Sequence, residues 1–88
     1  MDVRQRIGWN LRRLRVAKGL SQERLALEAE IDRSYVGRVE RGSENVTVGA
    51  LEAFASTLEV DVSAFFAELD PGAPRPLALR AGRKPKAH

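Results

Sequence analysis

Five residues between positions 33 and 41 share one face of an expected helix and could contact nucleic acid. They follow the spacing i, i+1, i+4, i+5 and i+8, and they are Arg33, Ser34, Gly37, Arg38 and Arg41. Arginine can donate two parallel hydrogen bonds to guanine O6 and N7, and a glycine lets a helix backbone approach a groove closely. This face could therefore read bases in the major groove of DNA. The alternative is a basic helix face that is exposed to solvent.

Residues for catalysis or for metal binding are missing from the sequence. The chain has no cysteine, and its single histidine is the last residue, His88. No acid, base and nucleophile occur at a suitable spacing, and there is no glycine-rich phosphate loop or metal cluster. We therefore expect no enzymatic activity, no metal and no cofactor.

Composition predicts one small soluble domain in the cytoplasm or on the bacterial nucleoid. The 88 residues are 43% hydrophobic and 31% charged, which suits a single core near the lower size limit. There is no apolar run near the ~20 residues that a membrane span needs, and the N-terminal residues lack the apolar stretch of a signal peptide. The absence of cysteine suits a reducing compartment.

Charge is distributed unevenly along the chain. Residues 1–41 contain ten Lys and Arg against six Asp and Glu, residues 42–70 contain none against six, and residues 71–88 contain five against none. A polyanion could meet one basic face while the acidic part points away or pairs with cations. A soluble protein whose uneven charge has no binding role is the alternative.

Apolar periodicity predicts an all-α, compact five-helix bundle in residues 1–69, followed by a Pro/Gly-rich basic tail in residues 70–88. The first helix is expected at Val3–Lys18, and the third is expected to end at Arg41. The apolar stripe of the first helix is Val3, Ile7, Leu11 and Leu14. The expected N-caps of the other four helices are Ser21, Asp32, Thr47 and Asp61. Their inward residues are Leu25, Ala26, Ala29, Val36, Val39, Leu51, Phe54, Ala55, Leu58, Phe65 and Leu69.

The segment LSQERLALEAEIDRSYVGRVERG resembles the helix-turn-helix of the phage repressor and Cro family, often called XRE. The resemblance extends from about Ile7 to Leu69 and includes LEAFASTLEVDVSAFF as helices four and five. Asp32–Val36 and Asn45 look especially like the controller proteins of restriction-modification systems. The resemblance implies a lambda-repressor-like DNA-binding domain, whose recognition helix, Asp32 to Arg41, enters the major groove.

Particular roles follow from this resemblance for residues of the present sequence. It implies that Arg33, Ser34 and Arg38 face base edges, and the shared helix face adds Gly37 to this base-reading set. It implies that Gln22, Tyr35 and Asn45 contact phosphates. Arg41, which lies a turn beyond the base-reading residues, and Ser43 in the following loop are also expected to contact phosphates. For Tyr35 the alternative is a half-buried packing ring. Arg15 and Glu40 match a family pair that ties helix one to the end of the recognition helix, so they are assigned to structure.

Two positions depart from the family pattern. Glu30 stands in the turn where the family commonly has glycine, a left-handed position that costs a residue with a Cβ about 1 kcal/mol. A corner of different shape is therefore one expectation for this chain, and the fold should tolerate the cost. Ser43 and Glu44 follow Gly42 where many relatives are basic. The phosphate contacts of this loop should therefore depend on backbone N–H groups and on Asn45.

The tail carries a weaker signal. Ala81–Lys86 is similar to hook peptides that lay a Gly-Arg segment into the minor groove, although the arginine that usually precedes the glycine is Ala81 here. Minor-groove insertion and non-specific attraction to phosphates are both open for this tail. The basic residues concerned are Arg80, Arg83, Lys84 and Lys86.

These features predict a sequence-specific DNA-binding transcriptional regulator that acts as a homodimer on a palindromic operator. A single helix-turn-helix of this size buries little surface, and pairing two copies doubles both contacts and specificity. Val62 and Phe66, on the outer side of helix five, are the expected subunit contacts. The alternative is an antitoxin or co-activator-like module whose main partner is another protein.

Overall fold

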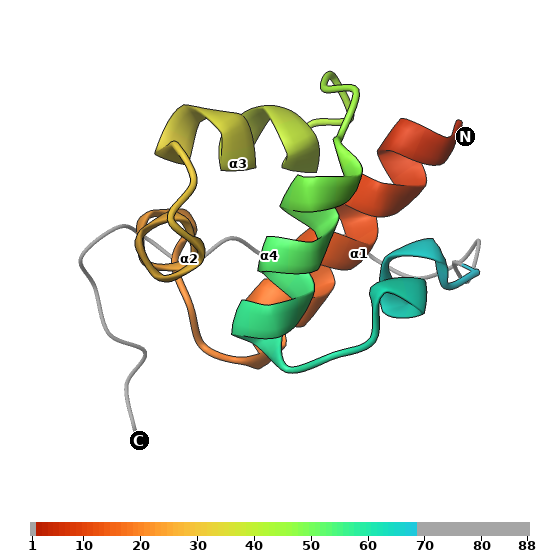
Figure 1. Cartoon of the computed structure of the whole chain (residues 1–88). Helices are drawn as coiled ribbons and strands as arrows, with labels where there is room; N and C mark the ends of the chain where they lie inside the picture. Colours follow the sequence, from red (N-terminus) through yellow and green to blue (C-terminus); the bar gives the residue numbers. More distant parts are fainter. Residues whose placement is uncertain (1, 69–88) are drawn as a thin grey trace.

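The computed structural model describes residues 2–68, which form four α-helices and one 3-10 helix. In chain order these are α1 (Val3–Ala17), α2 (Gln22–Ala29), α3 (Arg33–Glu40), α4 (Val48–Leu58) and η1 (Val62–Phe66) (Figure 1). The all-α prediction is confirmed. The predicted fifth α-helix is instead the short 3-10 helix η1. Within residues 2–68, no helix has both the length and the apolar character that crossing a membrane requires.

Side-chain caps begin the helices at the predicted residues. Ser21, Asp32, Thr47 and Asp61 each accept a hydrogen bond from a backbone N–H of the first turn of α2, α3, α4 and η1. These bonds satisfy donors that a helix start leaves without intrahelical partners. Asp2 caps α1 in the same way and was not predicted to do so. The polar residues between the apolar stripes therefore set where each helix starts.

Two glutamates end helices in the left-handed conformation. Glu30, after α2, has φ 58°, so the corner keeps the left-handed position although glycine is replaced there, and the different shape considered from the sequence is not found. Glu59, after α4, has the same φ and was not predicted to adopt it. In both cases the residue after the glutamate donates its backbone N–H to a carbonyl oxygen of the helix that has just ended. Ile31 N donates to Ala26 O at 2.9 Å, and Val60 N donates to Ala55 O at 3.0 Å. These bonds and the packing of Ile31 and Val60 against the core offset the cost of the left-handed residue.

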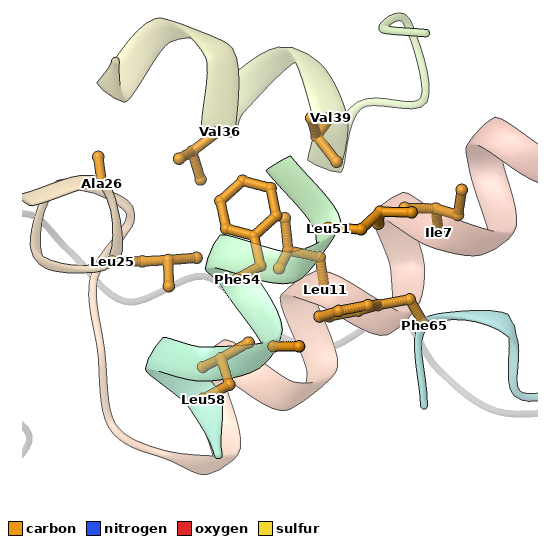
Figure 2. Packing of buried hydrophobic residues seen from close by; sticks show 11 residues of the cluster. Ile7, Leu11, Leu25, Ala26, Val36, Val39, Leu51, Phe54, Leu58 and Phe65 are labelled. Atoms are coloured by element: carbon orange, nitrogen blue, oxygen red, sulfur yellow. The ribbon is translucent and has the colours of Figure 1, made fainter. Parts of the chain in front are cut away.

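A single apolar core lies where the four α-helices meet η1. Figure 2 shows Phe54 of α4 between Val36 of α3 and Leu11 of α1, with Leu25 of α2 beside it. The buried apolar residues are Ile7, Leu11, Leu25, Ala26, Val36, Val39, Leu51, Phe54, Ala55, Leu58 and Phe65. Val3 was predicted to belong to this core but is 56% exposed, because it lies in the first turn of α1, before the buried stripe begins at Ile7.

Helix α1 crosses α3 at Gly8, where the two backbones approach closely. A Cβ at Gly8 would lie 2.3 Å from the carbonyl oxygen of Val39 and 2.9 Å from that of Glu40. Glycine is therefore required for this crossing. This contact sets the distance between α3 and α1.

Asn10 of α1 explains how η1 is held and why it is short. The Asn10 side chain is buried, and its Nδ2 donates to the carbonyl oxygens of Phe65 and Ala67, both at 3.0 Å. Ala67 has extended backbone, so the helical turn ends after Phe66. An amide from α1 thus binds the carbonyl groups that a longer helix would use itself.

Candidate nucleic-acid interface

Helices α2 and α3 form a compact corner at the edge of the molecule. In Figure 1, α2 is seen end-on while α3 lies along the plane of the picture, so the two axes are steeply inclined. Ala26 of α2 and Val36 of α3 are buried on the inner side of this corner. The opposite face of α3 is consequently left outside the apolar core.

A groove of about 560 Å³ runs along this outer face of α3. We call it the α3 groove, and its lining residues are Gln22, Asp32, Arg33, Ser34, Gly37, Arg38 and Arg41. The four residues predicted to read bases are all among them, with Gln22 and Arg41 of the predicted phosphate contacts. Three arginines against one aspartate give the α3 groove an excess of positive charge, which favours a polyanion.

Arg38 is held in place from three sides. Its Nε donates to Glu44 Oε1 at 2.7 Å, and its Nη1 donates to Ser34 Oγ at 3.3 Å. The guanidinium carbon lies 5.7 Å from the centre of the Tyr35 ring, within the range of a cation–π contact. The hydrogen bond to Glu44 raises the pKa of Arg38 above its already high ordinary value. Arg38 is therefore both cationic and oriented.

Arg33 is held at the other end of the α3 groove by a different carboxylate. Its Nη1 lies 3.1 Å from Glu23 Oε2, and the two side chains are 64% and 46% exposed. A pair this exposed is screened by solvent and contributes little to stability. Arg33 can therefore leave Glu23 at small cost.

The centre of the α3 groove is more covered than the sequence suggested. Gly37 was expected on an open face, but it is buried. A Cβ at Gly37 would lie 3.2 Å from Arg41 Nη1 and 3.8 Å from Gln22 Oε1. The side chains of Arg41 and Gln22 therefore lie over Gly37. Only tertiary packing could reveal this, since Gln22 comes from the neighbouring helix.

Beneath this groove lies a buried network centred on Glu40. Its carboxylate, with the side chain 0% exposed, accepts from Arg15 Nε at 2.6 Å and from Arg15 Nη2 at 2.9 Å. Arg12 Nε at 3.2 Å and Gln22 Nε2 at 3.0 Å also donate to it. The two residues of the predicted structural pair, Arg15 and Glu40, are thus in direct contact. The network joins α1, the start of α2 and the end of α3.

Arg12 is a second arginine partner of Glu40 that was not predicted. Arg12 precedes Arg15 by three residues, so both reach the same side of α1. That spacing was the available signal. The close crossing at Gly8 is what brings Glu40 within reach of both arginines.

Tyr35 packs against the core with its ring and keeps a hydroxyl hydrogen that it can donate. It is half-buried, packs against the core, and its hydroxyl oxygen accepts from the backbone N–H of Thr47 at 3.2 Å. The hydroxyl hydrogen can still be donated to another acceptor.

In the following loop, Ser43 donates to Arg38 O through both its N (3.0 Å) and its Oγ (3.2 Å), and Asn45 is exposed.

The remaining predicted residues differ in how accessible they are. Phe66 of η1 is 40% exposed, whereas Val62 is half-buried and packs against the core of its own chain. Leu69 and the four basic tail residues Arg80, Arg83, Lys84 and Lys86 lie outside the described residues.

Comparison with known proteins matches residues 6–65 to the family described as "Helix-turn-helix domain". A hypothetical transcription factor of Neisseria meningitidis is 42% identical over 59 residues, which are 67% of this chain and 56% of that protein. The restriction-modification controller protein C.AhdI from Aeromonas hydrophila is 46% identical with a TM-score of 0.70, covering 72% of this chain and 96% of that one. C.Esp1396I bound to a 19 base pair DNA duplex is 33% identical with a TM-score of 0.68, covering 75% and 88%.

Proposed function

The chain belongs to the helix-turn-helix family of the phage repressor and Cro type, a family of DNA-binding transcription regulators, and we propose that it controls transcription by binding a specific DNA sequence through α3. The observation that carries this proposal is the α3 groove. Its lining is basic, while the other side of the same helix is buried in the core. A helix with this division can enter the major groove of DNA without disturbing the fold.

Base reading is assigned to the α3 groove. Arg33 and Arg38 donate to guanine edges, Ser34 lies between them, and Gly37 marks the closest approach of the α3 backbone. Arg41 now covers Gly37, so its side chain moves to the rim of the groove or to a phosphate when DNA binds.

Phosphate binding is assigned to residues on both sides of α3. Gln22 begins α2, where backbone N–H groups and the helix dipole favour an anion, and one N–H of its side chain is held by Glu40. Tyr35 and Asn45 lie on the other side and donate from the hydroxyl and the amide, and Ser43 donates from its hydroxyl after this group rotates away from Arg38 O. These contacts set the register of α3 on the duplex.

The active form is proposed to be a symmetric homodimer on a palindrome. Its half-sites lie about one helical turn, roughly 10 base pairs, apart. Phe66 supports this proposal as an aromatic ring that is 40% exposed on η1.

Residues 1–69 form the proposed DNA-binding domain, and the basic residues of 70–88 add attraction to phosphates or reach the minor groove. The cytoplasm, at the bacterial nucleoid, is the proposed location.

Selection of binding sites from a random pool of duplexes tests this function. The full chain should enrich one palindromic sequence with half-sites roughly 10 base pairs apart. The affinity for that sequence should exceed the affinity for unrelated DNA by about a thousandfold or more. Failure to shift any duplex at low salt would contradict the proposal, and it would favour a module whose main partner is another protein.

A further inference from the structure

Glu44 places a carboxylate beside a surface that is proposed to meet DNA. It lies in the loop between α3 and α4, and its side chain is 24% exposed against 43% for Arg38. A negative charge here repels phosphates and weakens binding to any DNA. Glu44 also accepts a hydrogen bond from Arg38, with 2.7 Å between Glu44 Oε1 and Arg38 Nε.

The contact with Glu44 completes the immobilisation of Arg38. Ser34 Oγ accepts from Nη1 at 3.3 Å, and the Tyr35 ring lies 5.7 Å from the guanidinium carbon. Tyr35 is itself fixed, because its hydroxyl binds Thr47 N at 3.2 Å. A long side chain that is already ordered loses less conformational entropy when it binds.

The same contact determines which donors Arg38 can present. With Nε donating to Glu44 and one N–H of Nη1 donating to Ser34, the parallel N–H groups left for a ligand are one on Nη1 and one on Nη2. This pair can meet O6 and N7 of a guanine. A phosphate that also takes the N–H of Nε would displace Glu44 and leave that carboxylate without its partner beside the DNA backbone.

We propose that Glu44 is a specificity-determining residue that acts through Arg38. It orients the arginine for guanine in the operator, and it penalises the phosphate contacts that Arg38 would otherwise make on unrelated DNA. Glu44 is therefore a positioning residue, and it increases selectivity at the expense of total affinity. This inference rests on the proposed function, because it requires that α3 reads a specific sequence.

Two substitutions separate the charge of Glu44 from its contact with Arg38. Glu44→Gln and Glu44→Ala remove the same negative charge, but the amide oxygen of Gln can still accept from Arg38 Nε. Dissociation constants are measured for the selected operator and for an unrelated duplex of equal length, over a range of salt concentrations. The melting temperature of each variant shows that it folds.

Both variants should bind the unrelated duplex more tightly, with a log–log salt slope steeper by about 0.9 for each Arg38 that gains a phosphate. The ratio of operator affinity to unrelated affinity should fall about tenfold for Glu44→Ala, a fraction of what one bidentate contact to a base can supply. It should fall less for Glu44→Gln, because part of the contact remains.

A matched control and a double variant locate the effect. Glu28→Gln also removes one negative charge and one arginine partner, since Glu28 pairs with Arg24, but neither residue lines the α3 groove. This control should leave the affinity ratio unchanged. In an Arg38→Ala background, Glu44→Ala should produce no further loss of selectivity, because the residue acts through Arg38.

Three outcomes would overturn the inference. Equal tightening on both duplexes, with the wild-type ratio, would mean that Glu44 acts by charge alone. A tenfold loss of the ratio that persists without Arg38 would mean that Glu44 acts through another group. If the wild-type chain selects no sequence at all, the proposed function fails, and the inference fails with it.

Discussion

The buried carboxylate of Glu40 connects the fold to the DNA-binding surface. Burying a charge is costly unless it is paired and hydrogen-bonded, and here Arg15 supplies two hydrogen bonds and Arg12 a third. Within residues 2–68, every buried side-chain nitrogen and oxygen has a hydrogen-bond partner. Gln22 donates to the same carboxylate, so a residue at the edge of the α3 groove is positioned by charges inside the protein.

Substitution of the groove arginines separates base reading from phosphate binding. Arg33→Ala and Arg38→Ala should each lower operator affinity by about tenfold to a hundredfold, because each loses a bidentate contact to guanine. Each should also relax the preference at one symmetric pair of base positions. Gln22→Ala should instead weaken binding to all sequences alike. Binding-site selection with each variant is the measurement.

One outcome would contradict the assignment of Arg33 and Arg38 to base reading. If the two arginine variants bind all duplexes uniformly less well and still select the wild-type sequence, Arg33 and Arg38 contact phosphates only. The bases would then be read by another part of the chain.

At the scale of elements, the α1–α3 crossing is a contact of backbone on backbone. Gly8→Ala would place a Cβ 2.3 Å from Val39 O, and a backbone carbonyl cannot move aside without moving α3. We expect a loss of about 1–3 kcal/mol or more in the free energy of unfolding, measured by denaturant titration. This is opposite to the usual gain when alanine replaces glycine inside a helix.

Gly49→Ala is the matched control for this prediction. Gly49 lies in α4, and a Cβ there would have no atom within 4 Å. The substitution should therefore raise the free energy of unfolding, by up to about 1 kcal/mol. A Gly8→Ala variant as stable as the wild type would show that α1 and α3 are not this close in solution.

The cap of η1 should make part of the stability depend on pH. Hydrogen bonds from the Ser63 side chain and backbone lower the pKa of Asp61 below its ordinary value of 3.8. Since the folded-state pKa is the lower one, this stabilisation is present above pH 3.8 and is lost as the pH falls through the folded value.

Asp61→Asn tests the pH dependence without removing the cap. Asparagine also caps helices but does not titrate, so the variant should lose less stability than the wild type on acidification from about pH 5 to about pH 2. Melting curves followed by circular dichroism measure this. Parallel loss of stability in the two proteins would mean that the pKa of Asp61 is not lowered by folding.

At the scale of the whole molecule, Phe66 is the proposed contact between the two subunits of the dimer. Phe66→Glu should convert the proposed dimer into a folded monomer and weaken operator binding, because an exposed aromatic contact is replaced by a charge. Val62→Glu is a poorer test than the sequence suggested, since Val62 packs against its own core. Sedimentation with and without operator DNA measures the association state.

Leu27→Glu is the matched control for Phe66→Glu. Leu27 is 68% exposed on α2, so this variant adds the same charge at another exposed apolar position. It should remain dimeric. A strict monomer of the wild-type chain, both free and on its operator, would contradict the dimer.

Much of this protein was determined by local sequence. The spacing of Ile7 and Leu11 and the caps from Ser21 to Asp61 are properties of neighbouring residues, so the sequence alone predicted the helix starts, most of the core and the basic face of α3. The resemblance to a family then indicated the pairing of Arg15 with Glu40.

Tertiary structure decided the contacts between residues that are distant in the chain. The need for glycine at position 8, the carbonyl groups bound by Asn10 and the cover of Gln22 over Gly37 each depend on how two segments approach. The contact of Glu44 with Arg38, six residues apart, depends on the course of the loop after α3. Local periodicity fixes which face of a helix is apolar. The distance, crossing and neighbours of that helix are set only when all the elements pack around one core.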